Sequence, residues 1–112
     1  MPAMSVDQIS PQEAAAALEA GALLVDVRED DEWGAGHVAG AVHIPLADLG
    51  GRLAGLDPTR RTVFVCRVGS RSDVAAAIAD RAGFAAPANL DGGMRAWAAE
   101  GLPMEPDDGE VL

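Results

Sequence analysis

Short apolar runs alternate along this chain with segments that carry helix signals, and this alternation limits the fold more than any other feature. The best run is Thr62-Val63-Phe64-Val65, whose β-branched and aromatic side chains are typical of a buried strand. An alanine-rich helical segment, residues 72–82, follows it closely. Further strand signals occupy residues 6–9 (or an extended lead-in), 23–27, 41–44 and 88–90. Strands that alternate with helices form parallel β-α-β units, so the sequence predicts an α/β fold.

Helix signals fall between these runs. Ser10-Pro11-Gln12-Glu13 predicts a helix start, with Ser as N-cap and Glu completing a capping box, and the helix should reach about Ala20. Short helices are expected at residues 29–33 and 94–100, and residues 46–56 hold a helical period that Gly50-Gly51 weakens. The acidic tail is rich in Pro and Gly, so we expect it to be frayed.

Cys66 is the only cysteine, and it directly follows the best strand. In open α/β sheets, ligands sit beyond the carboxyl ends of the strands. Arg67 and Arg71 come next, with the start of a helix, and both cations and helix N-termini stabilise a thiolate. The alternative is a buried cysteine that only packs at the end of a strand. The cationic, glycine-containing loop favours a reactive thiol.

Charge and length exclude several classes of function. The 112 residues carry a formal net charge of −10, which argues against nucleic acid and anionic membranes as partners. No apolar stretch approaches the roughly 20 residues that span a bilayer, and no secretory signal begins the sequence. We therefore expect one cytoplasmic domain. A single cysteine also excludes an internal disulfide and a Cys-x-x-Cys redox pair.

Three segments, in order, resemble the signatures of the rhodanese-like (thiosulfate sulfurtransferase) family. Residues 66–71, Cys-Arg-Val-Gly-Ser-Arg, are similar to its active-site loop. The other two segments are Leu24-Val25-Asp26-Val27-Arg28 with Glu32-Trp33, Gly36-His37, Gly40-Ala41 and Ile44-Pro45, and Leu90-Asp91-Gly92-Gly93-Met94-Arg95-Ala96-Trp97 with Gly101-Leu102-Pro103. The resemblance implies a five-stranded, mainly parallel sheet with helices on both faces. It covers residues 5–103, with a flexible N-terminus at 1–4 and an acidic tail at 104–112.

The resemblance also implies a reaction. Cys66 would take a sulfane sulfur from a donor, hold it as a persulfide and pass it to an acceptor. The expected donor is a small anion such as thiosulfate, and the acceptor a thiol, cyanide or a sulfur-carrier protein. We expect neither a metal nor a cofactor. The residues expected to wrap around the sulfur and bind substrate are Arg67, Val68, Gly69, Ser70 and Arg71.

The length of the loop favours sulfur over phosphorus. Four residues separate Cys66 from Arg71, whereas the related phosphatase loops have five and cradle a tetrahedral phosphate. We therefore favour sulfur transfer over a phosphatase or arsenate reductase. Two further alternatives stay open, a non-enzymatic rhodanese-like docking or regulatory module and a thiol redox sensor.

The remaining polar and aromatic residues have weaker interpretations. Asp26 would either support the active loop or accept hydrogen bonds from backbone amides, and Arg28 is expected to pair with Glu32. Met94 would line the entrance of the pocket. Structural roles, without catalysis or metal binding, are expected for His37 and His43. We expect Trp33 and Trp97 to be core residues of short helices, and Ser70 and Ser72 to be loop and cap residues.

Overall fold

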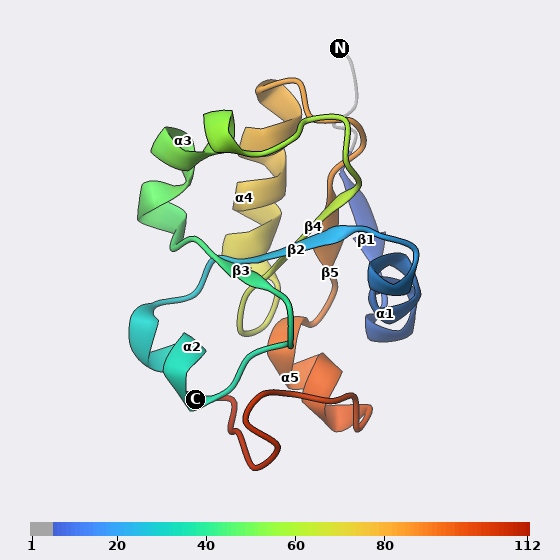
Figure 1. Ribbon diagram of the computed structural model, residues 1–112, viewed down its shortest axis with the longest axis vertical. Coiled ribbons are helices and arrows are strands. Elements are labelled where there is room, and N and C mark those ends of the chain that lie inside the picture. Colours follow the sequence, from blue (N-terminus) through green and yellow to red (C-terminus); the bar gives the residue numbers. More distant parts are fainter. Residues whose placement is uncertain (1–5) are drawn as a thin grey trace.

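The computed structural model describes residues 6–112, so the segment 1–4 that we expected to be flexible lies outside it. Five strands form one sheet in the order β1-β5-β4-β2-β3, and every pair of neighbours is parallel (Figure 1). The predicted α/β fold with a five-stranded sheet is confirmed. The strands are β1 (Asp7–Ile9), β2 (Leu23–Asp26), β3 (Val42–His43), β4 (Thr62–Val65) and β5 (Ala88–Leu90).

Helical segments connect consecutive strands. The expected period over residues 46–56 forms three consecutive short pieces, and Gly50 and Gly51 lie inside the central one rather than at a break. The segments are α1 (Pro11–Glu19), α2 (Asp30–Ala35), η1 (Leu46–Asp48), α3 (Leu49–Arg52), η2 (Leu53–Gly55), α4 (Ser70–Arg81) and α5 (Gly93–Ala99). None of those in residues 6–112 has the length and apolar character that crossing a bilayer requires.

Helix starts follow local chemistry in two different ways. The α1 helix has the predicted capping box, in which Ser10 Oγ accepts from the Glu13 amide and Glu13 Oε1 accepts from the Ser10 amide. The α4 helix begins two residues earlier than predicted, at Ser70, because Gly69 adopts φ 107° and turns the chain directly into the helix. This early start makes residues 70 and 71 part of the first helical turn.

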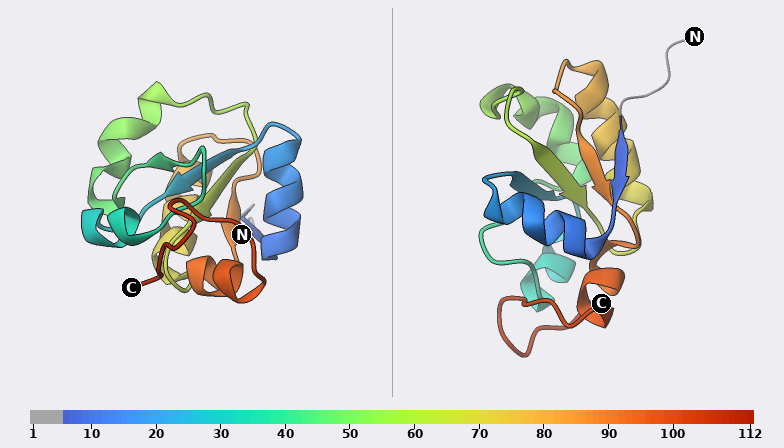
Figure 2. Two further views of the ribbon diagram at one scale, coloured as in Figure 1. Left: turned by 60° about the horizontal axis from the view of Figure 1, so that its bottom comes forward. Right: turned by 90° about the vertical axis from the view of Figure 1, so that its right-hand side faces the viewer.

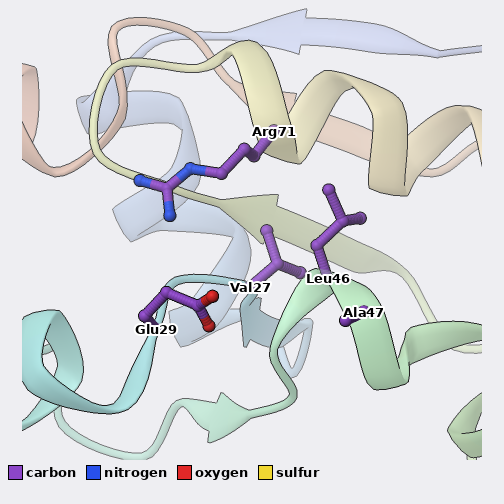
Figure 3. Close-up of a pocket in the computed structure, with 5 residues that line it drawn as sticks. All are labelled: Val27, Glu29, Leu46, Ala47 and Arg71. Carbon is purple, nitrogen blue, oxygen red and sulfur yellow. The ribbon is translucent and has the colours of Figure 1, made fainter.

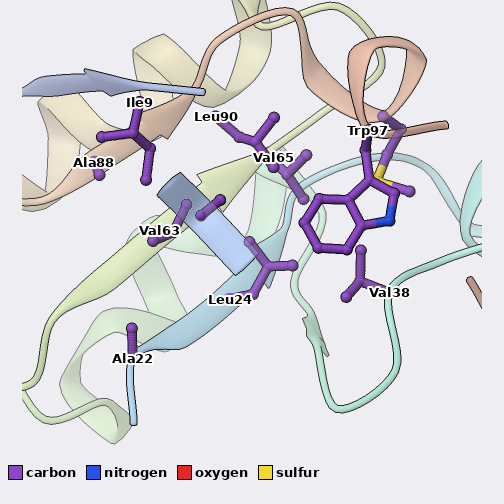
Figure 4. Packing of buried hydrophobic residues seen from close by; sticks show 11 residues of the cluster. Ile9, Ala22, Leu24, Val38, Val63, Val65, Ala88, Leu90 and Trp97 are labelled. Carbon is purple, nitrogen blue, oxygen red and sulfur yellow. The ribbon is translucent and has the colours of Figure 1, made fainter. Parts of the chain in front are cut away.

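Alternate side chains of the central strands enter two separate cores. Figures 1 and 2 show helices on both sides of the sheet. On one face, Leu24, Val63 and Val65 pack with residues of α1 and α5, and Figure 4 shows Trp97 at the edge of this core. On the other face, Val25 and Phe64 pack with residues of α3 and α4. Helices therefore cover both faces, and the carboxyl end of central β4 opens between them.

The C-terminal tail, residues 104–112, is folded back onto the domain, so the prediction that it frays is wrong. Glu105 forms an isolated antiparallel bridge with His37, and the Glu110 amide donates to the carbonyl of Ala35 at 2.8 Å. Val111 packs against the core that contains Met94 and Trp97. Figure 1 shows the end of the chain beside α2. These specific contacts outweigh the entropy that acidic, Pro- and Gly-rich composition gave reason to expect.

Candidate active site

Cys66 follows the last residue of β4 and is fully buried. Its backbone is fixed from the far side by the start of α5, since the Met94 amide donates to the Cys66 carbonyl at 2.8 Å and the Arg95 amide to the Arg67 carbonyl at 3.0 Å. Gly93 allows this close approach: a Cβ on it would lie 2.5 Å from the Cys66 oxygen. The segment at residues 90–97, which resembles a family signature, thus holds the Cys66 loop in place.

Two donors surround the sulfur of Cys66. The Gly69 amide donates to Sγ at 3.1 Å, and Ser72 Oγ lies 3.2 Å from Sγ. Burial raises the pKa of the Cys66 thiol. Hydrogen bonds lower it by more than burial raises it, and they come from the side chain and amide of Ser72 and from the amides of Gly69 and Val68. The resulting pKa lies below the ordinary value, so the loop favours the thiolate.

In the described part of the chain, the guanidinium groups of Arg67 and Arg71 hydrogen-bond other partners and not Sγ. Arg67 Nε donates to the Leu112 oxygen at 2.5 Å. Arg71 forms a bidentate pair with Glu32, both contacts at 2.8 Å. The acidic α2 helix and the folded tail offer these cations nearer anions and acceptors than the thiol. The pKa of Arg71 is raised chiefly by its hydrogen bonds with Glu32, and the Cys66 thiolate adds a smaller attraction at longer range.

The five residues expected to wrap around the sulfur divide into two groups. Gly69 is buried and donates its amide to the sulfur. Val68 is 46% exposed, and Ser70 is also exposed, so these two side chains face away from the thiol. Together with half-buried Arg67 and Arg71 they form the outer rim of the loop.

A cavity of about 290 Å³ lies beside the loop, at the carboxyl end of the sheet. Figure 3 shows the Arg71 guanidinium and the Glu29 carboxylate facing it from different elements, with Val27, Leu46 and Ala47 completing the wall. Val27 also belongs to the buried cluster that contains Cys66, so it connects the cavity with the surroundings of the thiol. Met94, which we expected at the entrance, is instead fully buried in the opposite core.

Arg28 and Asp26 form a buried ion pair below this edge of the sheet. Arg28 Nη2 lies 2.7 Å from Asp26 Oδ2 and also donates to the Gly36 carbonyl, and both side chains are fully buried. The predicted pairing of Arg28 with Glu32 is wrong, because Glu32 binds Arg71 instead. The pair anchors the end of β2 to the loop after α2, which supports the cavity wall from below.

The two histidines make structural contacts, as expected. Both rings stack on Trp33, with centroid distances of 3.7 Å for His37 and 4.8 Å for His43. His37 Nδ1 contacts the Trp33 carbonyl, and His43 Nε2 the Arg28 carbonyl. Trp33 is therefore half-buried in a stack rather than in a core, unlike Trp97. Within residues 6–112 no three His, Cys, Asp or Glu side chains gather where they could hold a metal ion.

Sequence reasoning missed Ser72 and Asn89 as neighbours of the reactive group. We interpreted Ser72 as a cap and Asn89 as part of a short strand, yet Ser72 Oγ contacts both Sγ and Asn89 Oδ1. The available signal was spacing: a residue six positions after Cys66, in the first turn of the following helix, can turn back to the strand end.

Comparison with known proteins agrees with the family resemblance seen in the sequence. The family model for the rhodanese-like domain matches residues 10–100. The chain is 41% identical over 80 residues to YtwF of Bacillus subtilis, named a sulfurtransferase, covering 71% of this chain and 77% of that protein. It is 34% identical over 90 residues to the thiosulfate sulfurtransferase GlpE of Pseudomonas entomophila, covering 80% and 83%.

Longer proteins and solved structures also match. The adenylyltransferase/sulfurtransferase MoeZ of Mycobacterium tuberculosis is 40% identical over 103 residues. The match covers 88% of this chain but only 26% of MoeZ. The crystal structure of a rhodanese-related protein from Thermoplasma volcanium superposes with a TM-score of 0.81 at 26% identity, over 88% of this chain and 96% of that one. On sequence and fold alike, this chain belongs to the rhodanese-like domain family.

Proposed function

We propose that this protein is a sulfurtransferase in which Cys66 carries the sulfane sulfur. The Cys66 thiolate attacks the outer sulfur of thiosulfate, the sulfur–sulfur bond of the donor breaks, and sulfite leaves with the electron pair. The product is the anion Cys66–S–S⁻. A thiol, cyanide or carrier-protein nucleophile then takes the terminal sulfur and restores the thiolate, so neither a metal nor an external oxidant takes part.

The observation that carries this proposal is the set of donors at Sγ in a member of a family with sulfurtransferase relatives. The Gly69 amide and the Ser72 hydroxyl stabilise negative charge at the place where the attacking thiolate forms. Pre-oriented donors of this kind lower the free energy of a charged state without reorganisation during the reaction. The same curled backbone supplies amides for the terminal sulfur of a persulfide.

The cavity adds information about the donor. Arg71 gives it one positive charge, but Glu32 already pairs with that guanidinium and Glu29 lines the same wall. An anionic donor therefore competes with two carboxylates for Arg71. We expect thiosulfate to act as a donor with modest affinity, and small donors of lower charge, such as a small-molecule persulfide, to load Cys66 more readily.

Burial of the thiol favours sulfur transfer over redox sensing. A sensor with one cysteine needs a second molecule to form its disulfide, yet Cys66 has no exposed surface in this conformation. A small donor that enters the adjacent cavity needs only a displacement of side chains such as Val27. Intermolecular disulfide formation would require the whole loop to open.

Intact-mass spectrometry tests the proposal. Fresh, reduced protein incubated with thiosulfate, or with a persulfide donor, should gain the mass of one sulfur atom, and cyanide should remove it as thiocyanate. Cys66→Ser should show neither event while it keeps the wild-type circular dichroism. Absence of the adduct with both donors would overturn the assignment, and a peroxide-induced disulfide dimer in its place would support the redox sensor.

A further inference from the structure

Ser72 Oγ lies within hydrogen-bond distance of two partners that compete for its single proton. One is Cys66 Sγ at 3.2 Å and the other is Asn89 Oδ1 at 2.6 Å, and all three side chains are at least 97% buried. A serine hydroxyl donates one hydrogen bond and accepts others. Which partner receives the proton therefore decides whether Ser72 stabilises the thiol or the thiolate.

The orientation of the Asn89 amide is fixed by its other neighbours. Asn89 Nδ2 lies 3.1 Å from the carbonyl oxygen of Gly69, which can only accept. It also lies 2.8 Å from Gln8 Oε1, and Gln8 Nε2 in turn faces Asp73 Oδ1 at 2.7 Å. A carboxylate also only accepts, so Gln8 cannot be reversed. The NH₂ group of Asn89 must therefore face Gly69 and Gln8, and its oxygen must face Ser72.

We infer that Asn89 is a positioning residue that draws the Ser72 proton away from Cys66. In the thiol form, the Cys66 S–H donates to Ser72 Oγ, and the Ser72 O–H donates to Asn89 Oδ1. Ionisation of Cys66 removes the S–H donor. Ser72 then turns its proton toward the sulfur and leaves the buried Asn89 oxygen without this partner. Asn89 thus opposes ionisation, and the thiol retains more protonated form than the loop amides alone would allow.

Charged groups around the thiol stay constant in the variants below, apart from the carboxyl group that Asn89→Asp introduces. They are Arg67 and Arg71 in the loop, Asp73 on α4, Glu29 and Glu32 on the α2 side, and Asp91 and Arg95 at the turn into α5. The chain has one cysteine and no tyrosine, so the far-ultraviolet absorbance of the thiolate follows a single group. The thiol pKa can therefore be measured directly in the full protein.

Two substitutions at Asn89 should affect the thiol pKa differently. Asn89→Leu removes the competing acceptor, so the pKa should fall by roughly half to one unit, which is the net value of one hydrogen bond. Asn89→Asp keeps an acceptor oxygen toward Ser72, and a proton on its other oxygen would satisfy the Gly69 carbonyl, so the pKa of the thiol should not fall. Loosening of the loop would instead change both variants in the same direction, and that result would overturn the inference.

Ser72→Ala tests whether Asn89 acts on the thiol pKa through the Ser72 hydroxyl or through the electrostatic field of the rest of the protein. This change should raise the pKa by itself, and adding Asn89→Leu to it should then cause no further decrease. An equal decrease in both backgrounds would show that Asn89 does not act through Ser72. If Asn89→Leu fails to fold, the near-isosteric Asn89→Asp still tests the scheme, because a lowered pKa in that variant contradicts it.

The consequence for catalysis rests on the proposed function, whereas the titration does not. A pKa that falls in Asn89→Leu and not in Asn89→Asp, without sulfur loading in the wild type, would leave the hydrogen-bond assignment intact and remove the sulfurtransferase. Sulfur loading without this pattern of pKa values would do the reverse.

Discussion

At the scale of single residues, the bidentate pair of Arg71 and Glu32 has a measurable pH dependence. Chiefly through the hydrogen bonds from Arg71, the pKa of Glu32 is lowered from 4.5 to about 2 in the folded protein. A carboxyl group with a lowered folded-state pKa stabilises the fold above its unfolded-state pKa, and this contribution is lost as the pH falls. The pair should therefore contribute fully above about pH 4.5 and nothing below about pH 2.

Glu32→Gln should lower the free energy of unfolding at neutral pH by about 1 kcal/mol, a modest value because the Arg71 side chain is 34% exposed. The difference from wild type should shrink as denaturant titrations are repeated toward pH 2. Asp31→Asn is the matched control, since it removes an exposed charge from the same first turn of α2. Equal effects of both substitutions at every pH would assign the loss to the helix dipole rather than to the ion pair.

Residue patterns predicted the place of the candidate nucleophile in the fold but not its hydrogen-bond partners. Cys66 followed from a strand end, a loop and a helix start, all of which are local in sequence. The partners of Arg28, Arg67 and Arg71 depend on which carboxylate or carbonyl the tertiary fold brings nearest, and several lie within reach along the chain. Ser72 meets Asn89 only because β4 and β5 are neighbours in the sheet. Such contacts carry no local signal.

At the scale of elements, the start of α5 positions the Cys66 loop by close backbone contact. Gly93 has φ +62°, and a Cβ there would lie 2.5 Å from atoms of Arg67 and Cys66. Gly93→Ala should therefore displace the loop and destabilise the fold by about 3 kcal/mol or more. Persulfide loading should be lost even under conditions where the variant remains folded.

Gly101→Ala controls for backbone strain in that experiment. Gly101 has φ +71°, but nothing lies within 4 Å of a Cβ built on it. Its substitution should cost about 1 kcal/mol and leave loading intact. Thermal unfolding and intact-mass spectrometry of the two variants provide the comparison. Similar losses in both would mean that the approach of α5 to the loop has no special role.

The tail depends on a second close approach, between α2 and residues near the C-terminus. A Cβ on Gly36 would lie 2.9 Å from the backbone of Glu110, although its φ of 170° is accessible to any residue. Gly36→Ala should therefore push the tail off without straining α2. Amide exchange at Glu110 should become roughly five- to tenfold faster through loss of its hydrogen bond to Ala35.

Gly34→Ala is the control for the tail, because Gly34 lies in the same helix with open space around it. Its substitution should leave exchange at Glu110 unchanged. Equal acceleration in the two variants would mean that helix α2 as a whole, and not this contact, holds the tail. Element prediction failed at the tail for a related reason. The composition of the tail indicated a high chain entropy. The tail is nevertheless ordered by contacts with residues 35–37, about 70 positions earlier in the chain.

At the scale of the whole molecule, two opposing fields act on an anionic donor. The net charge of −10 repels thiosulfate from a distance, whereas the arginines of the Cys66 loop attract it locally. Interactions between charges more than about 10 Å apart are largely screened at 0.1 M salt, so added salt weakens the distant repulsion first. Since Arg71 is already paired with Glu32, we expect the repulsion to control the encounter rate.

The rate of sulfur loading from thiosulfate should therefore rise a few-fold as monovalent salt increases from about 0.01 M to about 0.15 M, and then level off. Alkylation of Cys66 by neutral iodoacetamide controls for changes in the thiolate population, since it uses the same nucleophile without donor charge. Its rate should stay nearly constant over the same range. A loading rate that falls with salt, against a constant alkylation rate, would mean that the cationic loop governs capture of the donor. Arg71 would then act on the incoming anion despite its pairing with Glu32.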